Sequence, residues 1–265
     1  MLGAIVGDII GSRYEFANHK SKDFPLFDED CRYTDDSILT IAVADALLTC
    51  RDSFFTVSGY LVDSMQWFGK KYPDAGWTGF FGNWLKTLNP KPYGSYSSRA
   101  ANRISPVAWV AQSLEDALDI ADEVTNVTHN HPESIKGAEA VVSATYLALH
   151  GSSMEEIRRY ICENYYPLGF TLDEIRREYE FDVSCRGSVP QALEAFFESK
   201  CFEDAIRNAI SIGGDSDTIR AITGSIAEAY YGIPYAIRKK AMEYMDPVMQ
   251  EVIDEFEEKY GNKVG

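Results

Sequence analysis

The chain has 265 residues, of which 45% are hydrophobic and 25% charged, and a formal net charge of −16. This length and composition are typical of a soluble globular protein and exclude a disordered or fibrous chain. The acidic balance, with no basic stripe to offset it, argues against a nucleic-acid-binding surface, which must neutralise phosphates, so no stable binding to nucleic acid is expected.

The cysteines, the apolar first residues and the search for linkers and repeats indicate the compartment and the domain organisation. The five cysteines contain no CxxC pair, and an odd number fits poorly with a disulfide framework. The apolar start is interrupted by Asp8 and no cationic region precedes it, unlike a secretory signal, and no stretch has the length of a membrane span. We therefore expect a cytoplasmic protein without membrane partners. Since no linker or repeat marks a boundary, we expect a single domain over residues 1–265.

Apolar residues recur at helical spacing along most of the chain, and strand-like alternation is scarce, which predicts an all-α fold. In a first helix near residues 3–14, glycines at 3, 7 and 11 share one face and predict the close approach of another backbone. Residues 34–49 are apolar nearly all round, the pattern of a central helix covered on every side. Further helices are expected near residues 56–71, 105–122, 133–150, 154–164, 187–198, 202–211, 216–231, 235–243 and 247–260.

Three long irregular stretches separate these helices, at residues 17–33, 72–104 and 165–186. Loops of this length in a helical domain are more often functional than idle.

A Thr34-Asp35-Asp36 run stands directly before the apolar central helix. One such residue is enough to serve as a helix N-cap. Two adjacent carboxylates at an end expected to be buried would be costly without partners, because buried charges require pairing or metal coordination. The run is therefore a candidate metal site, with a simple cap as the alternative.

A second run, Asp215-Ser216-Asp217-Thr218, follows a Gly213-Gly214 turn and opens another helix of apolar periodicity. If the two helix starts face each other, four carboxylates and several hydroxyls converge. Such oxygen-only ligation suits Mg²⁺ or Mn²⁺ rather than zinc. Either run alone is more often a cap, but the pair favours a metal site.

Glu15 stands at the end of the first predicted helix, where it could present a carboxylate to a cleft. A solvated surface carboxylate is the usual fate of such a residue.

Four motifs in this sequence resemble those of the ADP-ribosylglycohydrolase family, and they occur in the family's order between residues 3 and 232. They are G-D-x-x-G-x-x-x-E from Gly7, Y-T-D-D ending at Asp36, T-H-N-H-P at 128–132 and I-G-G-D-S-D-T at 212–218. The resemblance implies an orthogonal all-α bundle that hydrolyses a glycosidic bond with two Mg²⁺ or Mn²⁺ ions in a cleft. The metal ligands that it implies are Thr34, Asp35, Asp36, Asp215, Asp217 and Thr218.

The resemblance also implies how the site would act. Glu15 resembles the family's acidic residue beside the scissile bond, where it would deliver a proton or position a water molecule. Asp35 and Asp36 would be the further catalytic carboxylates, stabilising an oxocarbenium-like state. His129 resembles part of the ADP-ribose site, and the alternative is that it helps to cap the helix near Pro132.

One loop departs from the family pattern S-[YW]-G-N-G-x-A-M-R-x-x-P. Ser95, Tyr96 and Arg103 keep the pattern and are candidate substrate-binding residues, but Ser97-Ser98-Arg99 replaces the G-N-G whose glycines bring backbone amides close to a diphosphate. Added Cβ atoms there weaken the expected phosphate grip. Arg99 could compensate, because a guanidinium is a good bidentate phosphate partner.

Three functions remain open from the sequence. The first is metal-dependent hydrolysis of the bond between ADP-ribose and an acceptor, either on an ADP-ribosylated protein or in a small molecule containing ADP-ribose. The second is a catalytically weak member that binds ADP-ribose or has a structural role, and the third is a hydrolase of another nucleoside or sugar conjugate. The acceptor linkage, arginine, serine or another, is left open.

Overall fold

The computed structural model describes residues 1–261 apart from residues 16, 52, 78 and 215, and only the backbone of residues 216 and 217. Within this part the chain is all helical, with 15 α-helices, the 3₁₀ helices η1 (Ser12–Tyr14) and η2 (Phe54–Thr56), and no strand. An isolated antiparallel bridge joins Ser97 and Ser184. The predicted all-α class is confirmed.

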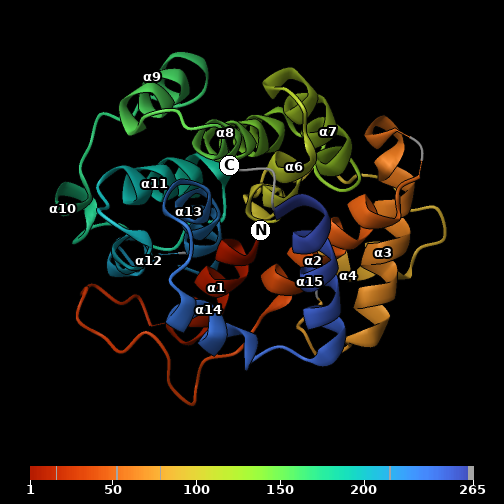
Figure 1. Ribbon diagram of the computed structural model, residues 1–265, viewed down its shortest axis with the longest axis horizontal. Helices are drawn as coiled ribbons and strands as arrows, with labels where there is room; N and C mark the ends of the chain where they lie inside the picture. Colours follow the sequence, from red (N-terminus) through yellow and green to blue (C-terminus); the bar gives the residue numbers. More distant parts are fainter. Residues whose placement is uncertain (16, 52, 78, 215, 262–265) are drawn as a thin grey trace.

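In Figure 1, helices α10 to α12 lie on the left of the molecule, helices α2 to α4 lie on the right, and α1 and α13 lie between these two groups. Their bounds are α1 Leu2–Gly11, α2 Asp35–Thr49, α3 Val57–Lys71, α4 Gly79–Lys86, α5 Arg99–Asn102, α6 Ser105–Val110, α7 Leu114–Asn126, α8 Pro132–Leu149, α9 Met154–Asn164, α10 Leu172–Ile175, α11 Cys185–Phe197, α12 Phe202–Ser211, α13 Ser216–Tyr231, α14 Tyr235–Met242 and α15 Pro247–Tyr260.

The centre of the core is the contact between α1 and α13, where the glycine face predicted on the first helix meets its partner. A Cβ on Gly7 would lie 2.7 Å from the carbonyl carbon of Arg220, and one on Gly3 would lie 2.9 Å from that of Gly224. Only a residue without a side chain permits such an approach of two backbones. The close approach of another backbone is therefore confirmed at Gly3 and Gly7, whereas a Cβ on Gly11 would meet the side chain of Arg220.

Helix α2 is buried along nearly its whole length, as the all-round apolar pattern predicted. It contacts α1, α3, α6 and α15, so each of its faces is covered. Its N-terminus, with Thr34 as the N-cap, is half-buried at Thr34 and Asp35 and buried at Asp36.

The prediction of a single helix over residues 105–122 is wrong, because the chain forms two helices there, α6 and α7, with a break at residues 111–113. Ser113 accepts a hydrogen bond from the backbone N–H of Asp116, whose carboxylate in turn accepts from that of Gln112. This capping starts a new helix within one apolar-periodic run. Helices α4, α5 and α10 lie within stretches expected to be irregular. None of the described helices is long and apolar enough to cross a membrane.

Candidate functional site

A cleft of about 810 Å³ opens at the N-terminus of α2. Its walls come from three segments far apart in the sequence: the end of η1, the approach to α2, and the loop after α3. Arg99, the first residue of α5, completes it. The lining residues are Glu15, Arg32, Tyr33, Thr34, Asp35, Lys71, Tyr72, Pro73, Asp74, Ala75, Gly76 and Arg99. Four of the predicted site residues, Glu15, Thr34, Asp35 and Arg99, therefore share one cavity.

The start of α2 is fixed by Asp8, a fully buried residue of α1. Its carboxylate accepts hydrogen bonds from the backbone N–H and the hydroxyl of Thr34, at 2.9 and 2.7 Å. It also accepts from the backbone N–H of Ser37 at 3.1 Å and from the Ser37 hydroxyl. A negative charge at a helix N-terminus satisfies backbone donors that the helix leaves unpaired. Asp8 therefore positions the whole Thr34-Asp35-Asp36 run.

The two carboxylates of this run have different environments. Asp36 is only 3% exposed, and its backbone N–H donates to Thr34 Oγ1 at 3.2 Å. Asp35 is half-buried and accepts a hydrogen bond from Arg99 Nη1 at 2.8 Å. The guanidinium of Arg99 therefore supplies positive charge to a carboxylate of the run.

The second predicted run is described only in part. Asp215 and the side chain of Asp217 lie outside the described residues, and Thr218 is buried. The turn before it is held from the loop after Glu15, since Gly214 N–H donates to Asn18 Oδ1 at 3.2 Å. Lys20 Nζ donates to the carbonyl oxygens of Tyr179 and Ile212 at 2.5 and 2.6 Å. The segment that follows Glu15 is thus tied to the turn that leads into α13.

The donor chemistry at the start of α2 fits a hard cation. Thr34 gives its hydroxyl proton to Asp8 and one lone pair to the Asp36 N–H, which leaves one lone pair for a cation. Carboxylate and hydroxyl oxygens are the ligands that Mg²⁺ and Mn²⁺ prefer. No three His, Cys, Asp or Glu side chains gather as a metal site within the described part of the chain. The full predicted ligand set, which needs Asp215 and Asp217, stays a prediction.

The loop before α5 is anchored to α8 and α11 through its backbone. The carbonyl oxygens of Ser95 and Ser97 both accept from the Ser134 hydroxyl, at 2.8 and 3.0 Å. Ser98 donates its backbone N–H to the carbonyl of Val183 at 2.9 Å, next to the bridge between Ser97 and Ser184. The Ser97-Ser98-Arg99 replacement is therefore part of an ordered loop. The Tyr96 side chain is exposed.

His129 is buried behind this loop. Its Nε2 lies 2.9 Å from Ser97 Oγ, and its Nδ1 lies 2.7 Å from Thr128 Oγ1. Thr128 Oγ1 accepts a hydrogen bond from Arg103 Nη2 at 2.6 Å. Burial, with the positive charges of Arg103 and Arg99, holds the pKa of His129 well below its usual range. Burial lowers the pKa of Arg103 to about 10, opposed by the nearby Tyr93 and Asp36.

The capping alternative for His129 is not what the structure shows. The N-cap of α8 is His131, whose Nδ1 accepts from the backbone N–H of Glu133 at 3.1 Å. Arg186 is highly exposed and lies 3.9 Å from the Glu133 carboxylate. Three of the predicted substrate-binding residues, Ser95, Arg103 and His129, thus belong to one network behind the loop.

Sequence reasoning missed Asp8 and Thr128 as parts of the site. Asp8 left a signal, because it is the one carboxylate in a helix whose other residues are all apolar or glycine. A buried charge of this kind demands partners. Thr128 is the first residue of the T-H-N-H-P motif, but nothing in the sequence indicates that its hydroxyl lies between Arg103 and His129.

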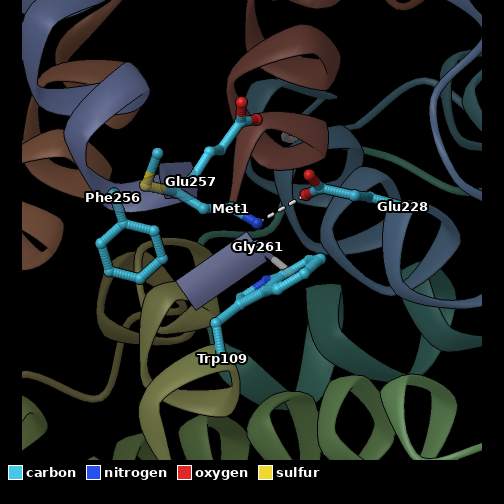
Figure 2. A pocket seen from close by; sticks show the side chains of 6 residues that line it. All are labelled: Met1, Trp109, Glu228, Phe256, Glu257 and Gly261. Carbon is cyan, nitrogen blue, oxygen red and sulfur yellow. Dashed lines mark hydrogen bonds and ion pairs between the residues drawn. The ribbon is translucent and has the colours of Figure 1, made fainter. Parts of the chain in front are cut away.

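A second and smaller pocket, of about 210 Å³, lies away from these residues. Figure 2 shows Met1 and Glu228 facing each other beside Trp109, with Phe256 and Glu257 on the other side. The Met1 ammonium lies 2.5 Å from Glu228 Oε2, so this carboxylate is already engaged by the backbone of α1. Among the predicted site residues that the structure describes, none lines this pocket.

Comparison with known proteins places the fold in a known class. The family model described as ADP-ribosylglycohydrolase matches residues 1–264. ADP-ribosylhydrolase ARH3 of Mus musculus is 26% identical, over 88% of this chain and 83% of its own length. ADP-ribosylarginine hydrolase Tri1 of Pseudomonas putida is 24% identical, over 96% of this chain and 76% of its own.

A solved structure titled ADP-ribosylglycohydrolase-related protein complex has the same fold. Its TM-score is 0.67 at 20% identity, with 98% of this chain and 95% of that chain covered. The protein is thus an all-α hydrolase with a polar cleft. It belongs to the ADP-ribosylglycohydrolase family. The family and the hydrolase class predicted from the motifs are confirmed.

Proposed function

We propose that this protein hydrolyses the glycosidic bond between ADP-ribose and an acceptor, and that it does so with two Mg²⁺ or Mn²⁺ ions. The observation that carries the proposal is the cleft, in which Glu15, Thr34, Asp35 and Arg99 meet. This combination offers an acid, hard oxygen ligands and a phosphate-binding cation in one cavity. The relatives named as ADP-ribosylhydrolase and ADP-ribosylarginine hydrolase support the same substrate class.

The cations would be held by the side chains of Thr34, Asp35, Asp36, Asp215, Asp217 and Thr218. When bound, they would supply positive charge to hold ribose hydroxyls in a protein whose net charge is −16. Asp8 fixes the first three of these residues by its hydrogen bonds to Thr34 and Ser37. Ligand geometry on this side is therefore set before any substrate enters.

The chain's own residues would carry the proton transfer and charge stabilisation. Glu15, which lines the cleft together with Asp35, would give a proton to the leaving group or position the attacking water. The carboxylates of Asp35 and Asp36 would stabilise the positive charge that develops at the anomeric carbon. Ser95, Tyr96, Arg99, Arg103 and His129 would form the ADP-ribose side, either by direct contact or by holding the loop.

The test is the release of free ADP-ribose from peptides ADP-ribosylated on arginine and on serine, followed by chromatography with Mg²⁺, with Mn²⁺ and with a chelator. Turnover of at least one linkage that the chelator abolishes is expected. Glu15→Gln should lose most of this turnover while it still binds ADP-ribose. A wild-type protein that binds ADP-ribose tightly yet releases none from either peptide would contradict the hydrolase proposal.

One observation favours a second candidate, a member that binds ADP-ribose but turns it over slowly. The Arg99–Asp35 ion pair engages a carboxylate that the hydrolase needs as a metal ligand. A guanidinium and a divalent cation compete for the same oxygen atoms. The two candidates differ in whether metal binding displaces this ion pair.

A further inference from the structure

Ser97 stands where the family pattern has a glycine, and its hydroxyl ends a chain of hydrogen bonds that begins at a buried arginine. The chain runs from Arg103 through Thr128 and His129 to Ser97. Each link has a donor side and an acceptor side. The donor in each of these hydrogen bonds can therefore be derived in turn, starting from Arg103.

Arg103 fixes the direction, because a guanidinium only donates. Its Nη2 donates to Thr128 Oγ1, which leaves the Thr128 proton to be placed. Thr128 is fully buried, and His129 Nδ1 at 2.7 Å is the acceptor for that proton within the described part of the chain. Leaving a buried hydroxyl proton without an acceptor is unfavourable, because the group has lost its hydrogen bond to water. Thr128 therefore donates to Nδ1.

His129 accepts a hydrogen bond at one ring nitrogen and donates from the other. With Nδ1 accepting and the imidazole neutral, its proton resides on Nε2. Neutrality follows from the burial of the ring next to the charge of Arg103. Nε2 lies 2.9 Å from Ser97 Oγ, so His129 donates to Ser97.

The hydroxyl proton of Ser97 is then available for donation. Its oxygen accepts from His129 and, at 3.2 Å, from the hydroxyl of Ser95. The oxygen of Ser95 accepts the Ser97 backbone N–H at 3.3 Å, which holds this pair in register. Among the residues that the structure describes, no acceptor receives the Ser97 proton. Ser97 is partly exposed and its carbonyl is anchored by Ser134, so the hydroxyl is presented from a fixed backbone.

We propose that the Ser97 hydroxyl is a preset hydrogen-bond donor to an anionic oxygen of the bound ligand, oriented by Arg103, Thr128 and His129. The ligand group is the diphosphate of ADP-ribose, an assignment that rests on the proposed function. Ser97 stands two residues before Arg99, whose guanidinium lines the cleft and prefers the same kind of oxygen. A hydroxyl donor thus takes the place of the backbone amides that glycines would bring to the phosphates.

The proposed direction of these hydrogen bonds can be tested without ligand or metal. The measurement is nitrogen NMR of the wild-type protein labelled in its four histidines. His129, assigned by its loss in His129→Gln, should show protonated Nε2 and bare Nδ1 at neutral pH. Thr128→Val, which removes the donor to Nδ1, should shift His129 toward a mixture of tautomers. A wild-type His129 protonated on Nδ1 would overturn the proposed direction.

The ligand is tested by calorimetry of the metal-loaded protein with ADP-ribose and with adenosine, which has no phosphate. Ser97→Ala should weaken ADP-ribose binding about tenfold or more and leave adenosine binding unchanged. Ser97→Thr, which keeps the hydroxyl, should regain most of the affinity. The matched control is Ser98→Ala, since the Ser98 hydroxyl donates to the carbonyl of Val183 inside the fold.

The outcomes separate the two levels of the proposal. A wild type that binds ADP-ribose, with Ser97→Ala binding it equally well, would overturn the role of Ser97 and leave the proposed function standing. A wild type that binds no ADP-ribose would overturn the proposed function and, with it, the ligand assigned to Ser97. Equal weakening of ADP-ribose and adenosine by Ser97→Ala would overturn the phosphate assignment.

Discussion

The carboxylate of Asp8, in the middle of α1, accepts hydrogen bonds from both the backbone N–H and the hydroxyl of Thr34, the N-cap of α2. This pairing joins the helix at the centre of the core to the helix that opens the cleft. It also commits the Thr34 proton, so that the remaining lone pair of that oxygen is available to a cation. Stability and cation binding are therefore expected to depend on the same buried carboxylate.

Asp8→Asn should lower the free energy of unfolding by about 3 kcal/mol, because an amide turns one acceptor into a donor against buried N–H and hydroxyl groups. It should also weaken Mn²⁺ binding at least about tenfold, since Thr34 loses its orientation. Urea unfolding and calorimetry measure the two effects. Asp45→Asn is the control, because Asp45, on α2, accepts from Ser64 at 2.7 Å, and it does not line the cleft. It should lose stability and keep Mn²⁺ affinity.

Arg99→Gly restores the glycine of the family pattern and should change two affinities in opposite directions. Removing the guanidinium takes away the competing ion pair with Asp35, so Mn²⁺ should bind up to about fivefold more tightly, the effect of an ion pair of about 1 kcal/mol with one partner half exposed. ADP-ribose should bind more weakly, because a phosphate partner is lost. Calorimetry with each ligand checks both. Unchanged Mn²⁺ affinity would show that the ion pair does not compete with the cation.

Gly7→Ala should destabilise the fold by about 2–3 kcal/mol, since the new Cβ would meet the backbone of Arg220 and force α1 away from α13. Gly59 in α3 offers the opposite case, because a Cβ there meets nothing within 4 Å. Gly59→Ala should therefore stabilise the fold by about 0.5 kcal/mol through helix propensity alone. Thermal and urea unfolding of the pair separate packing from propensity. Equal behaviour of the two variants would argue against the close helix contact.

The long helices and the close approach of another backbone to the glycine face of α1 could be predicted, because periodicity and glycine spacing are local signals. That the partner is α13 could not be predicted from that spacing. The break at residues 111–113 could not, since Ser113 interrupts an apolar pattern that runs on across it. Helices α5 and α10 have four residues each, too few for a periodic pattern.

The partners of the site residues were beyond sequence reasoning for a different reason. Thr34 bonds a carboxylate 26 residues away, and Ser97 bonds a histidine 32 residues away. Spacing along the chain does not specify such pairs. The resemblance to a family pointed to Glu15, Thr34 and Asp35, which line the cleft, but not to the contacts of Asp8 with Thr34 or of Arg99 with Asp35.

Stability should fall with decreasing pH because of His129. Its pKa is held well below the usual 6.5 in the folded protein by burial and by the charges of Arg103 and Arg99. Below pH 6.5 the His129 side chain binds a proton in the unfolded chain but not in the folded protein. The free energy of unfolding therefore decreases, by up to about 1.4 kcal/mol per pH unit. His129→Gln should remove this slope between pH 6.5 and 5. Urea unfolding of both proteins at pH 8, 6.5 and 5 is the test, and parallel pH profiles would contradict it.

Lys20 is expected to position Glu15, because it ties the segment after Glu15 to the carbonyls of Tyr179 and Ile212. Lys20→Met keeps the length of the side chain but donates nothing, so kcat for ADP-ribose release should fall about tenfold with little change in KM. The control is Lys22→Met in the same loop, since Lys22 pairs with Asp204 on α12 instead. That variant should keep its kcat. Loss of affinity for ADP-ribose in Lys20→Met, with kcat unchanged, would instead place Lys20 on the substrate-binding side of the cleft.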